Sequence, residues 1–304
     1  MRLRISLIVI CFAAIPVYSA ESRKPVIDMH MHATRASFAT GVLNRVAEYR
    51  DVTEWSVLDT VKAATSDEQV LEGTLNAMRR YRIVRAVTSG ELLDRFQDAA
   101  SDRIIPSLQL TQDDLKPDKV RELLSSGRYK VLGEITTQYG GIAPNDPRLD
   151  PIFAIAESLD IPVGIHMGMG GGSPAFRVSA GNPLLLEEVL ARHPRLRIYV
   201  MHAGYPMLGE MIAMMQVHRR LHVDIAEINW VRPPASFHSY LRGLVEAGLS
   251  KRIMFGSDQL VWPESFTIAI EAIEKADYLT EQQKRDILCF NAARFLRLEQ
   301  GLCE

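Results

Sequence analysis

The sequence predicts a (β/α)8 TIM barrel, formed by a single α/β domain that follows a signal peptide. The first observation is a regular alternation: eight short apolar runs alternate with amphipathic stretches over about 270 residues. The second is that several runs are almost continuously apolar, as strands are when helices cover a parallel sheet. With 304 residues, 47% of them hydrophobic, the chain also has enough apolar material for one large core.

The predicted strands begin near residues 25, 83, 103, 130, 161, 196, 221 and 252. Helix signals lie between them: Asp146–Pro147 and Asn182–Pro183 each pair an N-cap with a first-turn proline. Thr280 and Gln283 form a capping box before the last helix. An open doubly wound sheet is the alternative, but no glycine-rich phosphate turn follows the first strand. Residues 33–57 are predicted to form a lid or wall over the barrel mouth.

Residues 1–20 are predicted to be a secretory signal peptide. Two arginines precede the apolar run "ISLIVICFAAI" at 5–15, and "VYSA" offers a cleavage site. The run is too short for a comfortable membrane span, which leaves an uncleaved anchor as the weaker alternative. We therefore expect a periplasmic or secreted protein whose domain comprises residues 21–304.

Charge and cysteine content limit the possible partners. The net charge is −2 and no block of like charges occurs, which disfavours nucleic-acid binding. We expect a small-molecule substrate, with self-association left open. Cys11 lies within the signal, so Cys289 and Cys303 remain and could pair in an oxidising compartment. Two cysteines do not make a disulfide framework, so the fold must rest on its core.

Metal-binding and proton-transfer residues stand where the predicted strands end. His30 and His32 share one face of the first strand, because successive side chains alternate. The fourth to eighth runs end at or near Glu134, His166, His202, Asp224 and Asp258. Barrel enzymes build their sites at these strand ends, so we expect these side chains to converge. The remaining histidines are interpreted as structural or solvent-facing: His193, His218, His222 and His238.

The converging set predicts a metal site, since imidazole and carboxylate suit Zn²⁺ and similar divalent ions. The two histidines of the first strand, together with His166 and Asp258, could supply most of a coordination shell. A metal would lower the pKa of a coordinated water from about 15.7 toward roughly 7. Asp258 could also accept the proton of that water, and His202 could polarise a substrate carbonyl or protonate a leaving group.

The stretches "DMHMH", "GIHMG", "VMHAGYP", "MFGSD" and "NAARFLRL" resemble the amidohydrolase superfamily. The likeness covers residues 25–298 and is closest to the amidohydrolase-2 branch of metal-dependent hydrolases, which includes aminocarboxymuconate semialdehyde decarboxylase. The resemblance implies that both first-strand histidines and His166 are metal ligands. It implies that His202 is a catalytic acid or base, or a second-metal ligand. Asp258 would bind metal and shuttle the proton.

At the fourth strand, many binuclear members of this superfamily carry a carboxylated lysine, whereas this chain has Glu134 in "VLGEI". A glutamate can bridge two ions, as in the similar TatD-type nucleases. It can equally hydrogen-bond a ligand or contact the substrate. We include Glu134 among the metal-site residues, expect zinc as the ion, and favour one ion over two.

We expect an exported hydrolase that attacks a small ester, lactone or amide with a metal-activated water. The alternatives are a non-oxidative decarboxylase, a TatD-like nuclease and a non-catalytic metal-binding protein. Glu134 supports the nuclease, and the expected absence of a basic face weakens it. The loop "MGMGGGSP" at 167–174 could hold a substrate carboxylate or form a flexible wall. Five further residues could shape specificity or simply pack: Tyr205, Asn229, Trp230, Arg232 and Trp262.

Overall fold

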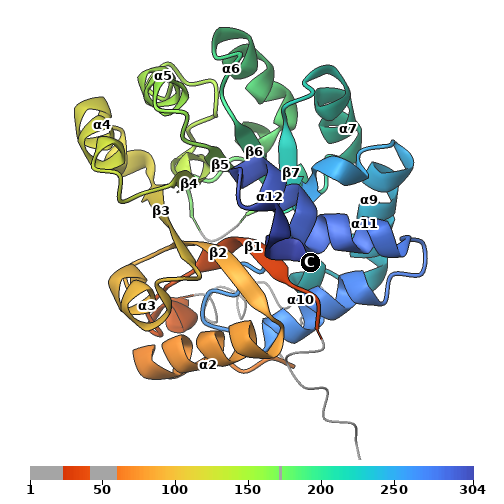
Figure 1. Ribbon diagram of the computed structural model, residues 1–304. Coiled ribbons are helices and arrows are strands. Elements are labelled where there is room, and N and C mark those ends of the chain that lie inside the picture. The colour runs from red at the N-terminus through yellow and green to blue at the C-terminus, as the bar shows by residue number, and fades with distance from the viewer. Residues whose placement is uncertain (1–22, 42–59, 171–172) are drawn as a thin grey trace, which may run out of the picture.

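The computed structural model describes residues 23–41, 60–170 and 173–304. The predicted signal peptide and residues 42–57 of the predicted mouth segment lie outside these ranges. Eight parallel strands pair in sequence order and curve into a nearly closed barrel surrounded by helices (Figure 1), which confirms the predicted fold class. The strands are β1 (Val26–His32), β2 (Ile83–Ser89), β3 (Ile104–Leu110), β4 (Val131–Ile135), β5 (Val163–His166), β6 (Ile198–Met201), β7 (His222–Asp224) and β8 (Ile253–Met254).

Most of the outer helices bury apolar side chains in the core. The outer helices are α2 (Asp67–Arg80), α3 (Leu93–Ala100), α4 (Pro117–Ser125), α5 (Asp150–Ser158), α6 (Glu187–Arg192), α7 (Leu208–Val217), α8 (Ile228–Val231), α9 (Pro234–Glu246), α10 (Ser265–Glu274), α11 (Glu281–Arg285) and α12 (Asn291–Leu296). Within the described residues, no helix combines the length and apolar character needed to cross a bilayer.

The predicted helix starts are confirmed at two of three positions. The capping box of Thr280 and Gln283 begins α11 with both reciprocal hydrogen bonds in place. Asn182 caps a short 3-10 helix whose first turn contains the proline, and α6 follows directly. Asp146 binds the side chain and backbone of Arg148 in a turn, and α5 begins only at Asp150. At Asp146 the local pattern therefore marks a turn before the helix rather than its start.

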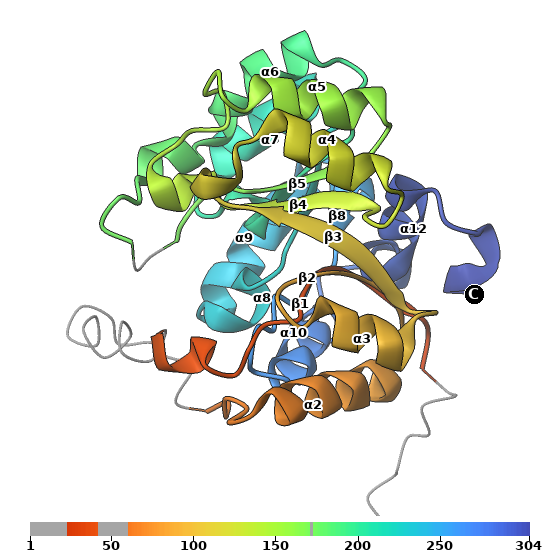
Figure 2. The same ribbon diagram turned by 90° about the vertical axis from the view of Figure 1, so that its left-hand side faces the viewer.

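The C-terminal helices close the end of the barrel where the strands begin. A π-helical turn at Asp286–Phe290 joins α11 to α12, and Cys289 from this turn packs with residues of the barrel floor. Cys289 forms a disulfide with Cys303, which is the pairing that the sequence left open. Figure 2 shows α12 and the C-terminus at this end of the barrel, opposite the short helical segment that follows β1.

The barrel ring is completed by the segment after β8 rather than by a regular ladder between β8 and β1. Met29 N–H donates to the Phe255 carbonyl over 2.9 Å, and Asp258 N–H donates to the His30 carbonyl over 2.7 Å. The backbone that closes the ring therefore also carries His30 and Asp258 toward each other.

Candidate metal centre

Six predicted site residues lie together at the mouth of the barrel. His30 and His32 end β1, and Glu134 lies near the end of β4. His166 is the last residue of β5, His202 follows β6, and Asp258 follows β8 by four residues. All six side chains are buried, with residue exposures between 2% and 7%. Residues separated by more than 200 positions thus share one site because parallel strands deliver them to the same end.

The first group of donor atoms comes from β1 and the segment after β8. The Nε2 atoms of His30 and His32 lie 3.1 Å apart, and Asp258 Oδ1 is 3.9 and 3.2 Å from them respectively. Glu134 Oε2 lies 3.5 Å from both imidazole nitrogens. Donors bound at about 2.1 Å to one tetrahedral ion are themselves about 3.4 Å apart, so these four atoms are spaced like ligands of a single cation.

The second group uses the other oxygen of Glu134. His166 Nδ1 lies 2.7 Å from Glu134 Oε1, and His202 Nε2 lies 3.4 Å from the same oxygen. The two imidazole nitrogens are 3.0 Å apart. The three atoms are close enough to share one ion, although the 2.7 and 3.0 Å separations are hydrogen-bond distances, shorter than the spacing of tetrahedral ligands. Glu134 therefore presents one oxygen to each group, which is the arrangement of a bridging carboxylate.

Polar neighbours of the Nδ1 atoms indicate which ring nitrogen of His30, His32 and His202 faces the site. Asp224 Oδ2 lies 3.3 Å from His30 Nδ1, and the Ala226 carbonyl accepts from His202 Nδ1 over 3.1 Å. Ser89 Oγ is 3.4 Å from His32 Nδ1. Each Nε2 is left to face the donor groups, and such outer partners commonly orient metal-bound histidines.

Two buried aspartates also hold the main chain of the site. Asp28 Oδ1 accepts from the backbone N–H groups of His30 and Ser257, which ties β1 to the segment after β8. Asp224 Oδ1 accepts from the backbone of His202 and Ala226, which ties the ends of β6 and β7 together. The sequence placed Asp224 near the end of a predicted strand and Asp28 within the first strand, but it assigned neither aspartate this role.

Gln259 is a site residue that sequence reasoning missed. Its Oε1 accepts the backbone N–H of His32 over 3.1 Å, and its Nε2 donates to the His32 carbonyl. Gln259 is fully buried and directly follows Asp258. That adjacency was the only available signal, because the contact depends on how the chain turns after β8.

The backbone at the mouth adopts conformations that non-glycine residues rarely use. His202 and Asp258 have φ values of 57° and 48°, and Ala203 and Glu227 also lie in the left-handed half of the map. Such conformations cluster at functional sites, where the surrounding structure holds them in place. Gly256 is similarly constrained, because a Cβ there would lie 2.9 Å from the His30 Cβ.

The electrostatics of the site keep its carboxylates ionised. Burial raises the pKa of Glu134 and Asp258, but the surrounding imidazoles outweigh it and hold both carboxyl pKa values below their usual range. Conversely, burial lowers the pKa of His30, and the Asp258 and Glu134 carboxylates raise it well above its ordinary value. For the more remote Asp28, burial dominates and raises the carboxyl pKa to about 7.

The donor set fits a divalent cation. Asp258 Oδ1 and His166 Nε2 are buried and have no hydrogen-bond partner among the described residues. An ionised buried oxygen without a partner is costly unless a cation compensates it. Imidazole nitrogens with carboxylate oxygens suit borderline divalent ions such as zinc or manganese.

Of the five residues predicted at the barrel mouth, four make structural contacts and Trp262 lines a cavity. Asn229 Nδ2 donates to the Gly256 carbonyl and Trp230 Nε1 donates to the Ser257 carbonyl, so both support the segment after β8. Arg232 pairs with Glu227 and lies over the ring of Tyr205.

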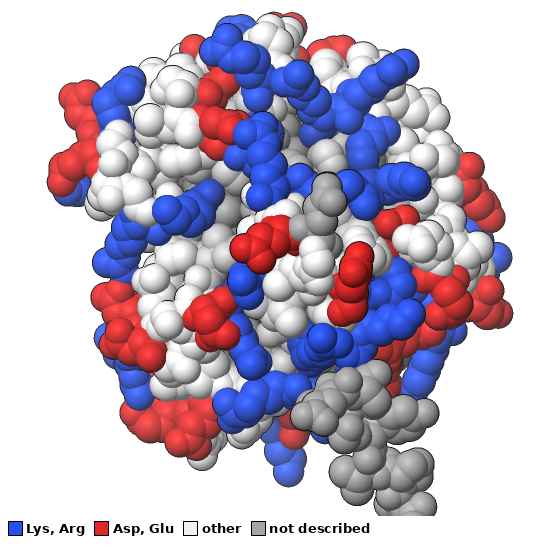
Figure 3. Space-filling view, in the orientation of Figure 1, with Lys and Arg blue, Asp and Glu red and all other residues white. Residues whose placement is uncertain are grey.

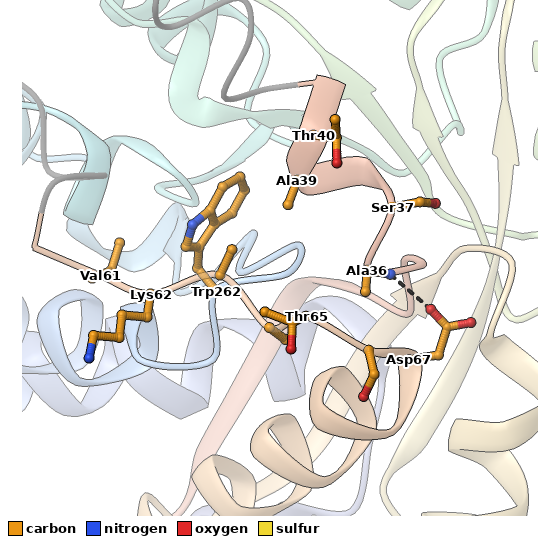
Figure 4. A pocket seen from close by; sticks show the side chains of 12 residues that line it. Ala36, Ser37, Ala39, Thr40, Val61, Lys62, Thr65, Asp67 and Trp262 are labelled. Atoms are coloured by element: carbon orange, nitrogen blue, oxygen red, sulfur yellow. Dashed lines mark hydrogen bonds between the residues drawn. The ribbon is translucent and has the colours of Figure 1, made fainter.

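The described ends of the predicted mouth segment border a cavity beside the barrel mouth. Residues 36–37, 39–40 and 61–67 line this cavity of about 780 Å³ together with Trp262 (Figure 4). The Ala36 N–H donates to Asp67 across one side of it. None of the candidate metal ligands lines the cavity, so it lies beside the donor groups.

The loop after β5 uses part of its backbone within the protein. The Gly168 N–H donates to the Gly181 carbonyl and the Met169 N–H donates to the Tyr205 carbonyl, both over 2.9 Å. These two amides are engaged, which favours a structural wall over a carboxylate cradle for this part of the loop. Residues 171–172 lie outside the described ranges.

The other histidines contact groups outside the donor cluster. His193 pairs with Asp150, and His238 lies 2.9 Å from the Tyr278 hydroxyl. His222 Nδ1 donates to the Arg220 carbonyl.

Comparison with known proteins agrees with this geometry. A family model for amidohydrolases matches residues 27–298. The curated protein fluG of Emericella nidulans is 24% identical over 154 residues, which are 46% of this chain. Those residues correspond to only 18% of fluG, so the chain spans less than a fifth of that protein's length.

Solved structures share the fold at low sequence identity. An uncharacterised TIM-barrel protein from Bordetella bronchiseptica has a TM-score of 0.69 at 20% identity, covering 90% of this chain and 98% of its own. A 5-carboxyvanillate decarboxylase from Novosphingobium aromaticivorans, complexed with manganese and 4-hydroxy-3-methoxy-5-nitrobenzoic acid, has a TM-score of 0.57 at 14% identity, covering 92% and 97%. A probable 2-pyrone-4,6-dicarboxylic acid hydrolase from Acinetobacter baumannii was solved with citric acid bound. It has a TM-score of 0.59 at 14% identity, and the match covers 90% of this chain and 99% of the hydrolase.

Proposed function

Because the chain belongs to the amidohydrolase family, we propose that it is a metal-dependent hydrolase of a small ester, lactone or amide. The observation that carries the proposal is the position of Glu134, whose two oxygens face two separate groups of donor atoms. One group is completed by His30, His32 and Asp258, and the other by His166 and His202. The sequence favoured one ion, but this division of donors supports two.

The bound ions would supply Lewis acidity, polarising a carbonyl oxygen and lowering the pKa of a water held beside it. The chain's own residues do the rest. Asp258 Oδ1 faces the β1 histidines, and its Oδ2 lies 4.0 Å from His202 Nδ1. In this proposal Asp258 Oδ2 accepts the proton of the attacking water and later returns it to the leaving group. His202 is fixed by the Ala226 carbonyl, which leaves its Nε2 to the second group of donor atoms.

Zinc remains our proposal for the metal, with manganese as the alternative, because a structural neighbour was solved with manganese. Metal analysis of the purified protein tests both the number and the identity of the ions. We expect close to two equivalents per chain, and the variants His166→Ala and His30→Ala should each lose binding in one group. His222→Gln, altered at the far end of the barrel, should keep full occupancy. A single equivalent in the wild type that is insensitive to His166→Ala would refute the two-ion arrangement.

Turnover separates hydrolysis from the second candidate, a non-oxidative decarboxylase. The decarboxylase is supported by the fold shared with 5-carboxyvanillate decarboxylase over 92% of this chain. Purified protein should be tested on a panel of esters, lactones and amides in ¹⁸O-labelled water, and on aromatic carboxylic acids with CO₂ detection. Label in the product acid, abolished by His30→Ala and kept by His222→Gln, supports hydrolysis. CO₂ release without label would assign a lyase.

Export also remains a proposal. It is supported by the apolar run at residues 5–15 behind two arginines, and by the Cys289–Cys303 disulfide, because such bonds persist in oxidising compartments. Fractionation of the native host, with the N-terminal residue of the mature protein determined by sequencing, tests it. A mature chain that begins near residue 21 in the exported fraction is the expected result.

A further inference from the structure

The end of the barrel opposite the metal centre carries a strong excess of positive charge. The segments that lead into the strands, with the C-terminal tail, contain twenty of the 35 lysines and arginines but only five of the 37 acidic residues. We call this surface the basic face; it comprises residues 23–25, 79–85, 100–103, 126–130, 158–162, 192–198, 217–222, 247–253, 284–286 and 294–304. The rest of the chain is correspondingly acidic, so a net charge of −2 conceals a marked separation of charge.

Acidic partners neutralise only some of these cations. Arg23 pairs with Glu274 of α10, and Arg195 pairs with Glu157 of α5. Asp160 is shared between two arginines of the basic face. Figure 3 shows this face of the molecule, on which blue side chains are numerous and red side chains lie both among them and toward the edge.

Other arginines of the basic face are held by neutral groups and keep their charge. Arg252 donates to the carbonyls that end α7 and the turn after it, including Met215 and His218. Arg285 donates to the Pro25 and Cys303 carbonyls. These bonds give the two arginines a structural role at helix and chain ends, but a carbonyl carries no net charge to offset the guanidinium.

The cations are crowded enough to affect each other. Burial, followed by the nearby charge of Arg219, lowers the pKa of Arg252. Burial, followed by Arg82, lowers the pKa of Arg285. Lys24, which begins the described chain with Arg23, is exposed and has no ion pair in the described part of the protein.

We propose that the basic face docks on a surface of anionic phospholipid headgroups. Headgroup phosphates attract such cations, each contributing roughly fivefold in affinity. The described chain begins at Arg23 on this face. Docking through the basic face would therefore bring the start of the predicted mature domain toward the bilayer. The metal centre lies at the opposite end of the strands and would stay open to solution.

This orientation also separates the proposal from nucleic-acid cleavage. A nuclease needs its cations beside the reacting metal, whereas these cations lie at the far end of the barrel from Glu134 and its neighbours. The inference does not depend on the hydrolase proposal, because no residue of the metal centre takes part in it.

Vesicle co-sedimentation of the purified protein, as the host produces it, tests the proposal. Vesicles of phosphatidylcholine alone are compared with vesicles that also contain phosphatidylglycerol. The variant Arg219→Gln/Lys251→Gln removes two exposed cations of the basic face. The matched control Lys116→Gln/Arg121→Gln removes one lysine and one arginine at exposed positions before and within α4, away from this face.

We expect binding only to phosphatidylglycerol-containing vesicles, decreasing as salt is added. The basic-face variant should bind on the order of thirtyfold more weakly, and the control should change by less than about twofold. Unchanged melting temperature and metal content would show that both variants are folded. Equal losses in both variants, equal binding to uncharged vesicles, or tighter binding to duplex DNA at the same salt concentration would each overturn the proposal.

Discussion

Two buried aspartates, Asp28 and Asp224, act in the same way on different ligand histidines. Each accepts two backbone N–H groups with one oxygen, and one of those groups belongs to a candidate ligand residue. Asp224 adds a second contact, because its other oxygen lies 3.3 Å from His30 Nδ1. A single carboxylate thus positions the His202 backbone and orients the His30 ring, so the two donor groups are coupled through one side chain.

Asp224→Asn should weaken metal binding without unfolding the protein. The amide keeps an oxygen for the two backbone N–H groups, but its NH₂ would face His30 Nδ1, where two donors oppose each other. Loss of such an outer partner commonly costs 10–100-fold in metal affinity, and we expect a decrease of about that size. Competition with a chelating dye measures the affinity. Asp118→Asn, at an exposed position of α4, is the control, and equal affinities for the two variants would contradict this role.

At the scale of the element, the start of β7 contains a histidine whose titration opposes folding in acid. Burial, with a smaller contribution from the nearby Arg252, lowers the pKa of His222 to about 4. In the unfolded chain the pKa lies near 6.5, so the unfolded state binds more protons between these two values. Stability is therefore complete above the unfolded pKa and is lost as the pH falls from about 6.5 toward 4.

His222→Gln should remove this acid sensitivity. Glutamine can still donate to the Arg220 carbonyl but does not titrate, so the variant should keep up to about 3 kcal/mol that the wild type loses across that window. Urea unfolding of both proteins at several pH values measures the difference. Parallel pH dependences for wild type and variant would show that another group controls the acid transition.

A disulfide cross-links the C-terminal segment where it closes the end of the barrel at which the strands begin. The Cys289–Cys303 disulfide links residues 14 positions apart, joining the π-helical turn to the last turn of the chain. A loop of this size restricts the unfolded chain by about 3 kcal/mol. Cys303→Ser should lower the free energy of unfolding by about that amount, and reductant should bring the wild type to the same value. Metal content should be unchanged, because the disulfide lies at the opposite end of the barrel.

At the scale of the whole molecule, the order of elements was predictable and the closing contacts were not. All eight strands match apolar runs, because a parallel sheet covered by helices leaves a continuous apolar signal. The convergence of His30, His166 and Asp258 followed from topology alone. Gln259 could not be predicted, since its contact with His32 depends on the turn after β8. The basic face escaped notice because its cations are spread over every strand start, with no local run.

The donor groups also join parts of the barrel that lie far apart in sequence. They come from β1, β4, β5, β6 and the segment after β8, and the ring is closed at β1 by the same segment that carries Asp258. A bound ion would therefore connect the first strand to the last unit of the fold. Binding to the folded state alone would stabilise it by about 2.7 kcal/mol at a free metal concentration a hundredfold above Kd.

We accordingly expect the whole barrel to melt several degrees higher with metal than after chelation, since each kcal/mol shifts the Tm of a large domain by roughly 2–4 °C. Calorimetry of the chelator-treated protein, with and without added zinc, measures this shift. Asp258→Asn should reduce the metal-dependent shift strongly, because it removes the donor that links the closing segment to β1, whereas Asp118→Asn should leave it intact. If removing the metal leaves the wild-type Tm unchanged, the ion does not hold the ring together, and the hydrogen bonds from Met29 to Phe255 and from Asp258 to His30 suffice to close it.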